Sequence, residues 1–422
     1  MATFEARRRA ITSRAGRSLA VISALFLALA PAAPASGAAT FDVAGWRRDF
    51  QHLKQEMAQR YANLDWIVSH RGLDLAALDA ETGAAIERAR TDGQAAAALR
   101  RFIDAFEDPH LKLVRGDRSS PPGAAAVAAV PRLPDPPAAV ASCQAAGYRS
   151  GNPRFRFPFN RLPGWAPVRD GPFATGVAGD LGVLRIAALG EDSYLTACRE
   201  VVRPGMTARG LRMAVRARLQ QSLIEAIDDL RARGARRLLV DVTGNGGGTE
   251  WVTEVIALMT DQTLVRPAGR LVDPACDRSA IWRGEPVCPV LAPAGEPLRL
   301  TGNGRWVGPL FILVDHETGS ASEDFVAWLQ QNRVAVVIGA RTAGAGCGYV
   351  NGGGRIRLQA GALDVMAPNC ARFLNDGTNE IEGITPDVEI AMDGANRAAA
   401  LAAALSAAPA RPVPPPTSTP AV

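Results

Sequence analysis

The chain has 422 residues, of which 47% are hydrophobic and 21% charged, and its formal net charge is +5. These proportions are ordinary for globular proteins and exclude a wholly disordered chain, and the length allows two or three domains. Only Lys54 and Lys112 among the 47 basic residues are lysines, which leaves 45 arginines. A mechanism that depends on a lysine therefore has two candidates.

Residues 1–38 have the order of segments that is typical of a secretory signal peptide. Five arginines precede an apolar run from Leu19 to Ala30, and small residues follow. The run spans about 12 residues, which is shorter than the ~20 that a membrane-spanning helix needs. We therefore predict cleavage after Ala35 or Ala38 and a periplasmic or secreted protein with no membrane span in the mature chain. A retained, uncleaved anchor is the alternative.

Cleavage would also remove most of the positive charge. Residues 1–38 carry five arginines and one glutamate, so the remaining chain has a net charge of only about +1. A nearly neutral chain does not support a basic nucleic-acid surface, and no nucleic-acid partner is predicted.

The cysteines favour disulfides over a metal site. None of the six stands in C-x-x-C spacing, and an even number in an exported protein indicates a disulfide framework. Six cysteines allow fifteen pairings, among which we predict that sequence neighbours pair, Cys276 with Cys288 and Cys347 with Cys370. Neither a metal nor another cofactor is predicted.

The part before the core is expected to be a helical domain over 39–115. Phe50, Leu53 and Met57 recur at three- and four-residue spacing, as one buried helix face requires. The following segment, 116–178, is rich in proline and glycine and is predicted to be an irregular connection.

From residue 179 the predicted strands and helices alternate. Strands are expected at 181–186, 237–242, 310–314 and 334–338, and helices at 211–233, from 250, and at 322–331. This alternation predicts an α/β core with parallel strands over 179–395. Residues 396–422 are predicted to form an alanine-rich helix and a proline-rich tail.

The first turn with chemical potential runs from Asp241 to Gly248, between a predicted strand and a helix. Its glycines let backbone N–H groups approach a ligand closely, and the following helix start favours negative charge. A phosphate cradle, an oxyanion hole and a plain tight turn all fit. No Gly-Lys-Ser/Thr follows, which excludes a P-loop, and the glycine spacing matches a dinucleotide fingerprint poorly.

The second such turn runs from Thr318 to Glu323. A serine between a strand and a helix, such as Ser320, has an exposed hydroxyl, and the helix start stabilises a developing anion. Glu323 lies three residues after Ser320, so the pair also fits a helix-capping box. The two interpretations are compatible, because a nucleophile can stand at a helix start.

These two turns, in this order, resemble the C-terminal-processing and tricorn-type serine protease family, the tail-specific proteases. The resemblance extends from about Gly182 to Ile390. Its parts are the entry strand 181–186, the strand and glycine turn 238–248 with Thr243 where arginine is usual, the nucleophile segment 319–344, and the closing segment 380–387. The resemblance implies a core of crotonase/protease-like ββα units behind the helical domain.

The resemblance also implies roles for individual residues. Ser320 matches the nucleophile of the family. The backbone N–H groups of Ala321 and of Gly246 or Gly247 match its oxyanion hole.

The general base depends on the branch of the family. One branch uses a lysine about 25 residues after the serine, but Ala345 stands there and no lysine follows Lys112. The tricorn-type branch uses an upstream histidine, and the segment 106–110 resembles its Asp-x-His motif with Asp108 and His110. Histidine suits this role because its pKa near 6.5 lets it accept and return a proton at neutral pH.

Support for the histidine is less complete. Glu380 matches the supporting carboxylate of the family, and Glu382 is the fallback. Pro109 replaces the serine that precedes the histidine in the tricorn pattern, and proline offers neither a hydroxyl nor an N–H. The link from Glu380 to His110 must then be direct, through water, or missing. His316, four residues before the nucleophile, could line the site or bind substrate.

Three functional hypotheses follow. The first is an exported serine peptidase that acts on a peptide or protein substrate. The second, motivated by Pro109 and the missing lysine, is a catalytically weak or inactive peptide- or ligand-binding protein on the same scaffold. The third is a structural protein of the cell envelope whose helical domain mediates contacts. The oligomeric state is not predicted.

Overall fold

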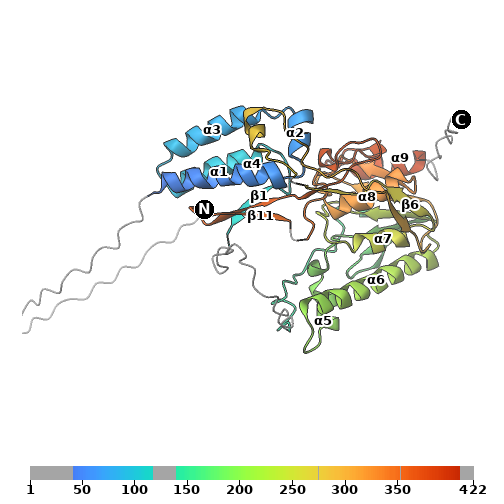
Figure 1. Ribbon diagram of the computed structural model, residues 1–422. Helices are drawn as coiled ribbons and strands as arrows, with labels where there is room; N and C mark the ends of the chain where they lie inside the picture. Colours follow the sequence, from blue (N-terminus) through green and yellow to red (C-terminus); the bar gives the residue numbers. More distant parts are fainter. Residues whose placement is uncertain (1–40, 117–138, 274, 352, 409–422) are drawn as a thin grey trace, which may run out of the picture. The chain divides into compact units, whose positions relative to one another are not determined.

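A computed structural model of the protein describes residues 41–116, 139–273, 275–351 and 353–408. The predicted signal peptide and the proline-rich tail lie outside these residues. The predicted fold class is confirmed, because a helical region precedes a mixed α/β core that is built on a largely parallel sheet (Figure 1).

The N-terminal part consists of α1 (Val43–Arg60), α2 (Leu64–His70), α3 (Leu75–Arg88) and α4 (Asp92–Asp104). Side chains of Asp42, Asp74 and Thr91 accept hydrogen bonds from backbone N–H groups in the first turns of α1, α3 and α4. Such caps satisfy donors that the helix itself leaves free, which explains where these helices begin.

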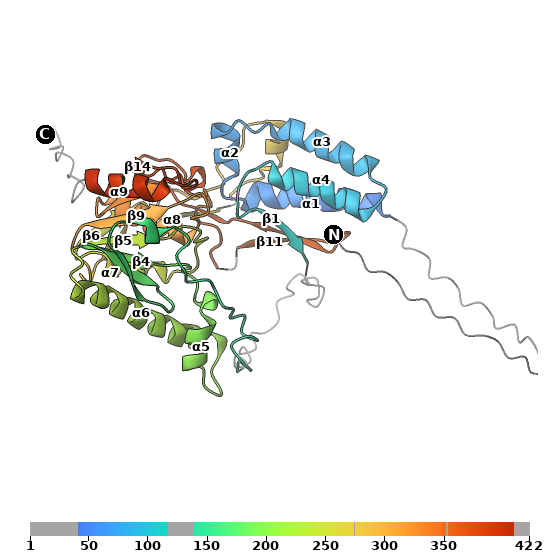
Figure 2. The same ribbon diagram turned by 180° about the vertical axis from the view of Figure 1, so that it is seen from behind.

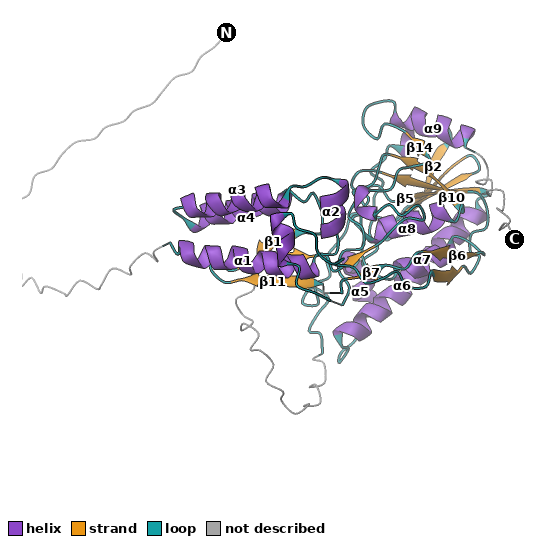
Figure 3. Ribbon diagram, turned by 45° about the horizontal axis from the view of Figure 1, so that its top comes forward, coloured by secondary structure: helices purple, strands orange, loops and turns teal. Residues whose placement is uncertain are grey.

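These helices pack on strands from distant parts of the chain. A three-stranded antiparallel sheet has the order β1 (Lys112–Arg115), β12 (Leu363–Ala367) and β11 (Gly354–Leu358), and Figure 3 shows it beside α1 and α4. Ile356 and Val365 share one buried apolar cluster with the helices, and Trp282 joins it. The helical region is therefore not a separate unit that ends at residue 115.

The main sheet has seven strands. Its order is β14 (Val388–Glu389), β10 (Ala335–Gly339), β9 (Leu310–Val314), β5 (Arg237–Asp241), β4 (Leu181–Arg185), β3 (Thr175–Ala178) and β2 (Trp165–Arg169). Neighbours are parallel from β14 to β4, and β3 and β2 continue the sheet in antiparallel pairing. Part of the predicted irregular connection thus forms two strands of this sheet.

Helices cover both faces of the main sheet, as Figure 2 shows for α6 and α9 on opposite sides. Leu238 and Val240 of β5 belong to one apolar cluster with α6 (Ala208–Ala232), α7 (Val252–Leu258) and α8 (Ala321–Gln331). Leu239 belongs to the opposite cluster with α9 (Arg397–Ala407). Burial on both faces explains why these strands are continuous apolar runs.

The structure also contains shorter helices and two short strand pairs. They are η1 (Phe159–Arg161), η2 (Glu191–Ser193), α5 (Leu195–Val201), η3 (Ser279–Arg283), η4 (Glu380–Glu382), and the antiparallel pairs β6 (Thr263–Arg266) with β8 (Leu298–Thr301) and β7 (Arg270–Leu271) with β13 (Cys370–Ala371). Within the described ranges, no helix is both long and apolar enough to cross a membrane.

Three disulfides join the six cysteines. The predicted pairs Cys276–Cys288 and Cys347–Cys370 are confirmed, and the third pair is Cys143–Cys198. Disulfides fit an oxidising compartment such as the periplasm or the extracellular space.

Candidate active site

The two predicted turns meet at one edge of the main sheet. β5 and β9 are parallel neighbours, so the segments that follow their carboxyl ends lie side by side. Contact is close at Gly247, where an added Cβ would lie 2.7 Å from the Ser320 Cβ and 2.7 Å from the Gly319 carbonyl oxygen. The Gly247 backbone also has a φ of +102°, so this position requires glycine for both reasons.

Asn245 fixes the glycine turn from inside. This fully buried side chain donates to the Ile186 carbonyl at 3.0 Å and accepts from the Gly247 N–H at 3.0 Å. The backbone carbonyl of Asn245 accepts from the Gly319 N–H at 3.0 Å, so this bond joins the two turns. Gly247 thus has its N–H engaged, whereas a Cβ added to Gly246 would meet nothing within 4 Å. Of the two predicted oxyanion donors, Gly247 thus already has a partner for its N–H, the Asn245 side chain.

Ser320 has an unusual backbone conformation at the start of α8. Its φ is +57° and its ψ is −119°, a region that costs a residue other than glycine about 1–3 kcal/mol. Its N–H donates to the Glu323 carboxylate at 2.8 Å, and its carbonyl accepts from Arg372 at 2.9 Å. The carboxylate half of the predicted capping box is therefore formed.

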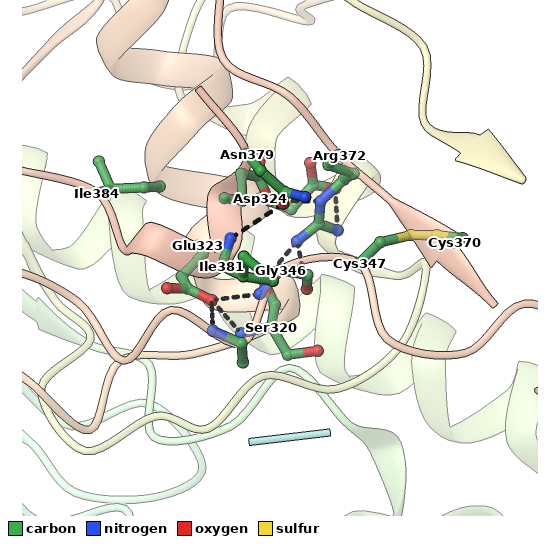
Figure 4. Close-up of polar contacts among 12 residues, drawn as sticks. Ser320, Glu323, Asp324, Gly346, Cys347, Cys370, Arg372, Asn379, Ile381 and Ile384 are labelled. Carbon is green, nitrogen blue, oxygen red and sulfur yellow. Dashed lines mark hydrogen bonds and ion pairs between the residues drawn. A yellow bond between two sulfur atoms is a disulfide. The ribbon is translucent and has the colours of Figure 1, made fainter. Parts of the chain in front are cut away.

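Glu323 has no solvent exposure and accepts far more than a helix cap would require (Figure 4). Besides Ser320, its donors are the Thr342 hydroxyl at 2.6 Å and the N–H groups of Gly344 at 2.7 Å, Ala345 at 2.9 Å and Gly346 at 3.1 Å. Burial raises the pKa of this carboxyl, and the hydrogen bonds from Thr342, Ser320 and Gly344 oppose that shift.

His110 lies on the loop immediately before β1 and is held by the loop that contains Ala345. Its Nδ1 is 2.6 Å from the Ala345 carbonyl oxygen. A carbonyl can only accept, so Nδ1 carries the proton and Nε2 is left as the basic nitrogen. A Cβ added to Gly348 would lie 2.9 Å from Nε2, and the Tyr349 ring meets the imidazole edge to face at 5.3 Å. The ring is therefore fixed in both tautomer and orientation.

The surroundings of His110 favour the neutral imidazole. Burial lowers the pKa of His110 below its usual value, and the positive charges of Lys112 and Arg372 act in the same direction. The Asp108 carboxylate and the hydrogen bond to Ala345 oppose them. A neutral imidazole at neutral pH is the form that can accept a proton.

Asp108 is the carboxylate that the structure places beside His110. One oxygen accepts from the His110 backbone N–H at 2.9 Å. The other accepts from the Tyr61 hydroxyl and from the Asn63 side chain, both at 2.9 Å, and Asn63 in turn accepts from Asn379 at 3.0 Å. Pro109 therefore stands in a turn whose hydrogen bonds are accepted by the Asp108 carboxylate.

Glu380 and Glu382 have other partners than expected. Glu380 is fully buried and pairs with Arg266 and with the Arg372 Nε, the latter at 2.6 Å. Glu382 accepts from Arg71 and Trp66, both at 2.9 Å. Within the described part of the chain neither carboxylate is hydrogen-bonded to His110. Of the three links from Glu380 to His110 left open by the sequence, the direct one is not formed, because two arginines pair with the Glu380 oxygens.

His316 is exposed and borders a different hollow. It lines a cavity of about 400 Å³ together with Arg156 and Arg397, and neither Ser320 nor His110 is among the residues that line it. His316 therefore shares no lining with the two predicted catalytic residues in this cavity.

The Ser320 turn and His110 are connected through Ala345. Its carbonyl binds His110, and its Cβ lies 3.5 Å from a Cβ added to Gly319, the residue before Ser320. Among the described residues no hydrogen bond joins the Ser320 hydroxyl to His110. Catalytic hydrogen bonds are often long without substrate and shorten when it binds.

Three contributors to this arrangement were not predicted from the sequence. The Ala345 carbonyl is a backbone group, so the residue type gives no signal for it. Arg372 stands in an unremarkable segment. Asn245 was noted only as part of the glycine-rich turn, although an amide between glycines at a strand end is a plausible turn organiser.

Comparison with known proteins assigns the fold and its family. The model of peptidase family S41 matches residues 180–390, which is half of the chain. The chain belongs to peptidase family S41. The match contains both turns and the closing segment with Glu380, so the resemblance to tail-specific proteases is confirmed.

Solved structures agree with the S41 assignment at the level of the fold. Mature CPAF has a TM-score of 0.56 at 14% identity, with 82% of this chain and 92% of that chain covered. A candidate peptidase from Parabacteroides merdae has a TM-score of 0.57 at 16% identity, with 86% and 96% covered. Mature CPAF complexed with lactacystin has a TM-score of 0.56 at 13% identity, with 85% and 96% covered.

Proposed function

We propose that the protein is an exported serine peptidase in which Ser320 is the nucleophile and His110 is the general base. Family membership supports a peptidase acting on peptides or proteins. The observation that carries the assignment of the base is the 2.6 Å contact between His110 Nδ1 and the Ala345 carbonyl, since it leaves Nε2 free to accept a proton.

The chemistry would proceed by acyl transfer. His110 Nε2 accepts the proton of the Ser320 hydroxyl as its oxygen attacks the substrate carbonyl, which gives a tetrahedral oxyanion. The imidazolium then returns the proton to the leaving amine, and a water molecule releases the acyl group by the reverse sequence. The Gly246 and Ala321 N–H groups are proposed to stabilise the oxyanion.

In this proposal a backbone carbonyl replaces the usual carboxylate partner of the histidine. The Ala345 carbonyl orients the ring, and the Asp108 charge stabilises the imidazolium at a distance. Glu323 binds backbone N–H groups and Glu380 binds two arginines, so neither carboxylate is assigned a bond to the imidazole. A neutral partner at Nδ1 stabilises the imidazolium less than a carboxylate does, so a modest turnover rate is expected.

The test is cleavage of a defined peptide mixture by the protein purified after export, followed by mass spectrometry. We expect products from the wild type, none from Ser320→Ala, and a loss of at least about 10²-fold for His110→Ala. His316→Ala is the matched control and should cleave normally. Intact peptides with folded wild-type protein would contradict the proposal and favour a binding protein on the same scaffold.

Export is proposed from two features together. Residues 1–38 have the composition of a signal peptide. The three disulfides suit an oxidising compartment. Sequencing the N-terminus of the protein from a secreting host should place the first residue after Ala35 or Ala38, and an intact Met1 would contradict cleavage.

A further inference from the structure

We propose that Glu323 and Arg372 are positioning residues that lock the nucleophile turn (319–321) and the histidine-binding loop (344–348) into one geometry. This inference rests on the proposed function, since it assigns the two residues a part in the Ser320 reaction. We refer to the pair as the clamp.

The acidic half of the clamp joins the two segments through one oxygen. Glu323 Oε2 accepts from the N–H groups of Ser320 at 2.8 Å, Ala345 at 2.9 Å and Gly346 at 3.1 Å. Ala345 is also the residue whose carbonyl binds His110 Nδ1. The backbone of Ser320 is therefore linked to the imidazole through Glu323 and then through Ala345, which bonds to Glu323 by its N–H and to His110 by its carbonyl.

The basic half of the clamp joins the same segments from their carbonyl side. The Arg372 Nη2 donates to the Ser320 carbonyl and to the Gly346 carbonyl, both at 2.9 Å. Figure 4 shows Arg372 beside Ser320 and Gly346, with the Cys347–Cys370 disulfide adjacent. Both backbone groups of Ser320 are thereby held by charged side chains.

The guanidinium is itself held in place by carboxylates. Glu380 binds its Nε at 2.6 Å, and Asp324 lies 3.7 Å from its Nη1. Because hydrogen bonds to charged groups are stronger than neutral ones, these contacts give a rigid support. They also give Glu380 a function in this chain that does not require contact with His110.

The strain at Ser320 gives a reason for the clamp. A serine at φ +57° and ψ −119° relaxes to a commoner conformation unless its surroundings prevent it. The geometry between a nucleophile and its base must hold to within fractions of an ångström for efficient reaction. One carboxylate and one guanidinium that each contact both segments satisfy this requirement directly.

Two buried residues elsewhere provide matched controls. Asp49 is a buried carboxylate that accepts from the N–H groups of Gln359 at 2.9 Å and Ala360 at 2.7 Å. Arg278 is a fully buried arginine that donates to the Ala58 carbonyl at 2.6 Å and pairs with a carboxylate. Both pack with the N-terminal helices, and among the described residues no hydrogen bond or ion pair joins either of them to residues 319–321 or 344–348.

The experiment compares Glu323→Gln and Arg372→Lys with the controls Asp49→Asn and Arg278→Lys. A fluorophosphonate probe reports the rate constant for covalent labelling of Ser320, and urea unfolding reports stability. We expect the clamp variants to label about 10²-fold more slowly than the wild type, because misplacement of about 1 Å has that effect. The controls should lose comparable stability and keep the wild-type labelling rate.

A second variant adds a measurement that a purely structural role would not change. Arg372→Met removes a positive charge that lowers the pKa of His110, so the pH midpoint of labelling should rise. Arg372→Lys keeps the charge and should leave the midpoint unchanged. Thr342→Val removes one donor to Glu323 and should slow labelling about tenfold, which keeps the test open if Glu323→Gln does not fold.

The labelling rates distinguish failure of the clamp from failure of the proposed function. Wild-type labelling rates in folded Arg372→Lys and Thr342→Val would overturn the clamp and leave the proposed function intact. Absence of labelling in the folded wild type would instead overturn the proposed function, and the clamp with it.

Discussion

Replacing Glu380 with glutamine should weaken folding without altering the titration of His110. Glu380 has no solvent exposure, and its two oxygens pair with Arg266 and Arg372. Removing one partner from a buried ion pair typically costs about 3–5 kcal/mol, because the remaining charge loses its compensation. Both guanidinium groups keep Asp324 nearby, so a value at the lower end of that range is expected.

This loss converts into a measurable shift of the melting temperature. At about 2.1 cal/mol/K per residue, a folded chain of roughly 350 residues has an unfolding entropy of about 0.7 kcal/mol/K. A loss of about 3 kcal/mol should therefore lower the melting temperature by about 4 °C. Urea unfolding followed by circular dichroism measures the free energy directly. Glu382→Gln, which breaks a partly exposed pair with Arg71, is the control and should cost about 1 kcal/mol.

The activity of Glu380→Gln decides between two roles for this carboxylate. If Glu380 supported the imidazolium, its removal would lower the pKa of His110 and move the acid limb of kcat/KM to lower pH. The observed contacts predict that the midpoint of this limb stays where it is in the wild type. A downward shift of the midpoint with unchanged stability would instead show that Glu380 supports the imidazolium.

Three further predictions concern the same site. The pKa of His110 is lowered by burial, so the acid limb of kcat/KM should have its midpoint below 6.5. Because His110 binds its proton more readily in the unfolded state, the free energy of unfolding in urea should also fall as the pH drops below 6.5. An acid-limb midpoint above 6.5 would contradict the lowered pKa and, with it, this pH dependence of stability. Gly247→Ala should slow fluorophosphonate labelling by about 10²-fold, since the new methyl would collide with Ser320, and an unchanged rate would argue against that contact. Replacing Cys347 and Cys370 together by serine should cost about 3 kcal/mol in urea unfolding, and an equal stability would show that the loop needs no crosslink.

Much of the core was predictable because its patterns are local. The strand expected at 310–314 coincides with β9, and the strand expected at 237–242 exceeds β5 by one residue. The helix expected at 211–233 begins three residues earlier, at Ala208, since Thr207 caps it. Apolar runs and caps of this kind lie within a short stretch of sequence.

Other parts of the fold depend on contacts between distant residues. β2 contains Pro167 at the edge of the sheet, and such short strands lack the alternation that marks a half-buried strand. The pairing of β1 with β12 joins residues about 250 positions apart, and no local pattern specifies it. The separation into a helical domain and a core was therefore incomplete.

In the candidate site, too, local features were predictable from the sequence and contacts between distant residues were not. The meeting of the Ser320 turn with the glycine turn was predictable, because each turn motif is contiguous in sequence. The orientation of His110 was not predictable, because it depends on the backbone carbonyl of Ala345. In the sequence this position was notable only because it lacks the lysine of one branch of the family. Glu323 was predicted as a helix cap, and its contacts with residues 344–346 became visible only in three dimensions.

In the proposed mechanism, Ser320 is a nucleophile activated by His110. The most direct measurement is the mass of the folded, exported protein after incubation with a fluorophosphonate probe, followed by mapping of the modified peptide. We expect one adduct on Ser320, absent in Ser320→Ala and formed at least about 10²-fold more slowly in His110→Ala. An unmodified wild-type protein, or labelling of Ser320 at the same rate in His110→Ala, would contradict it.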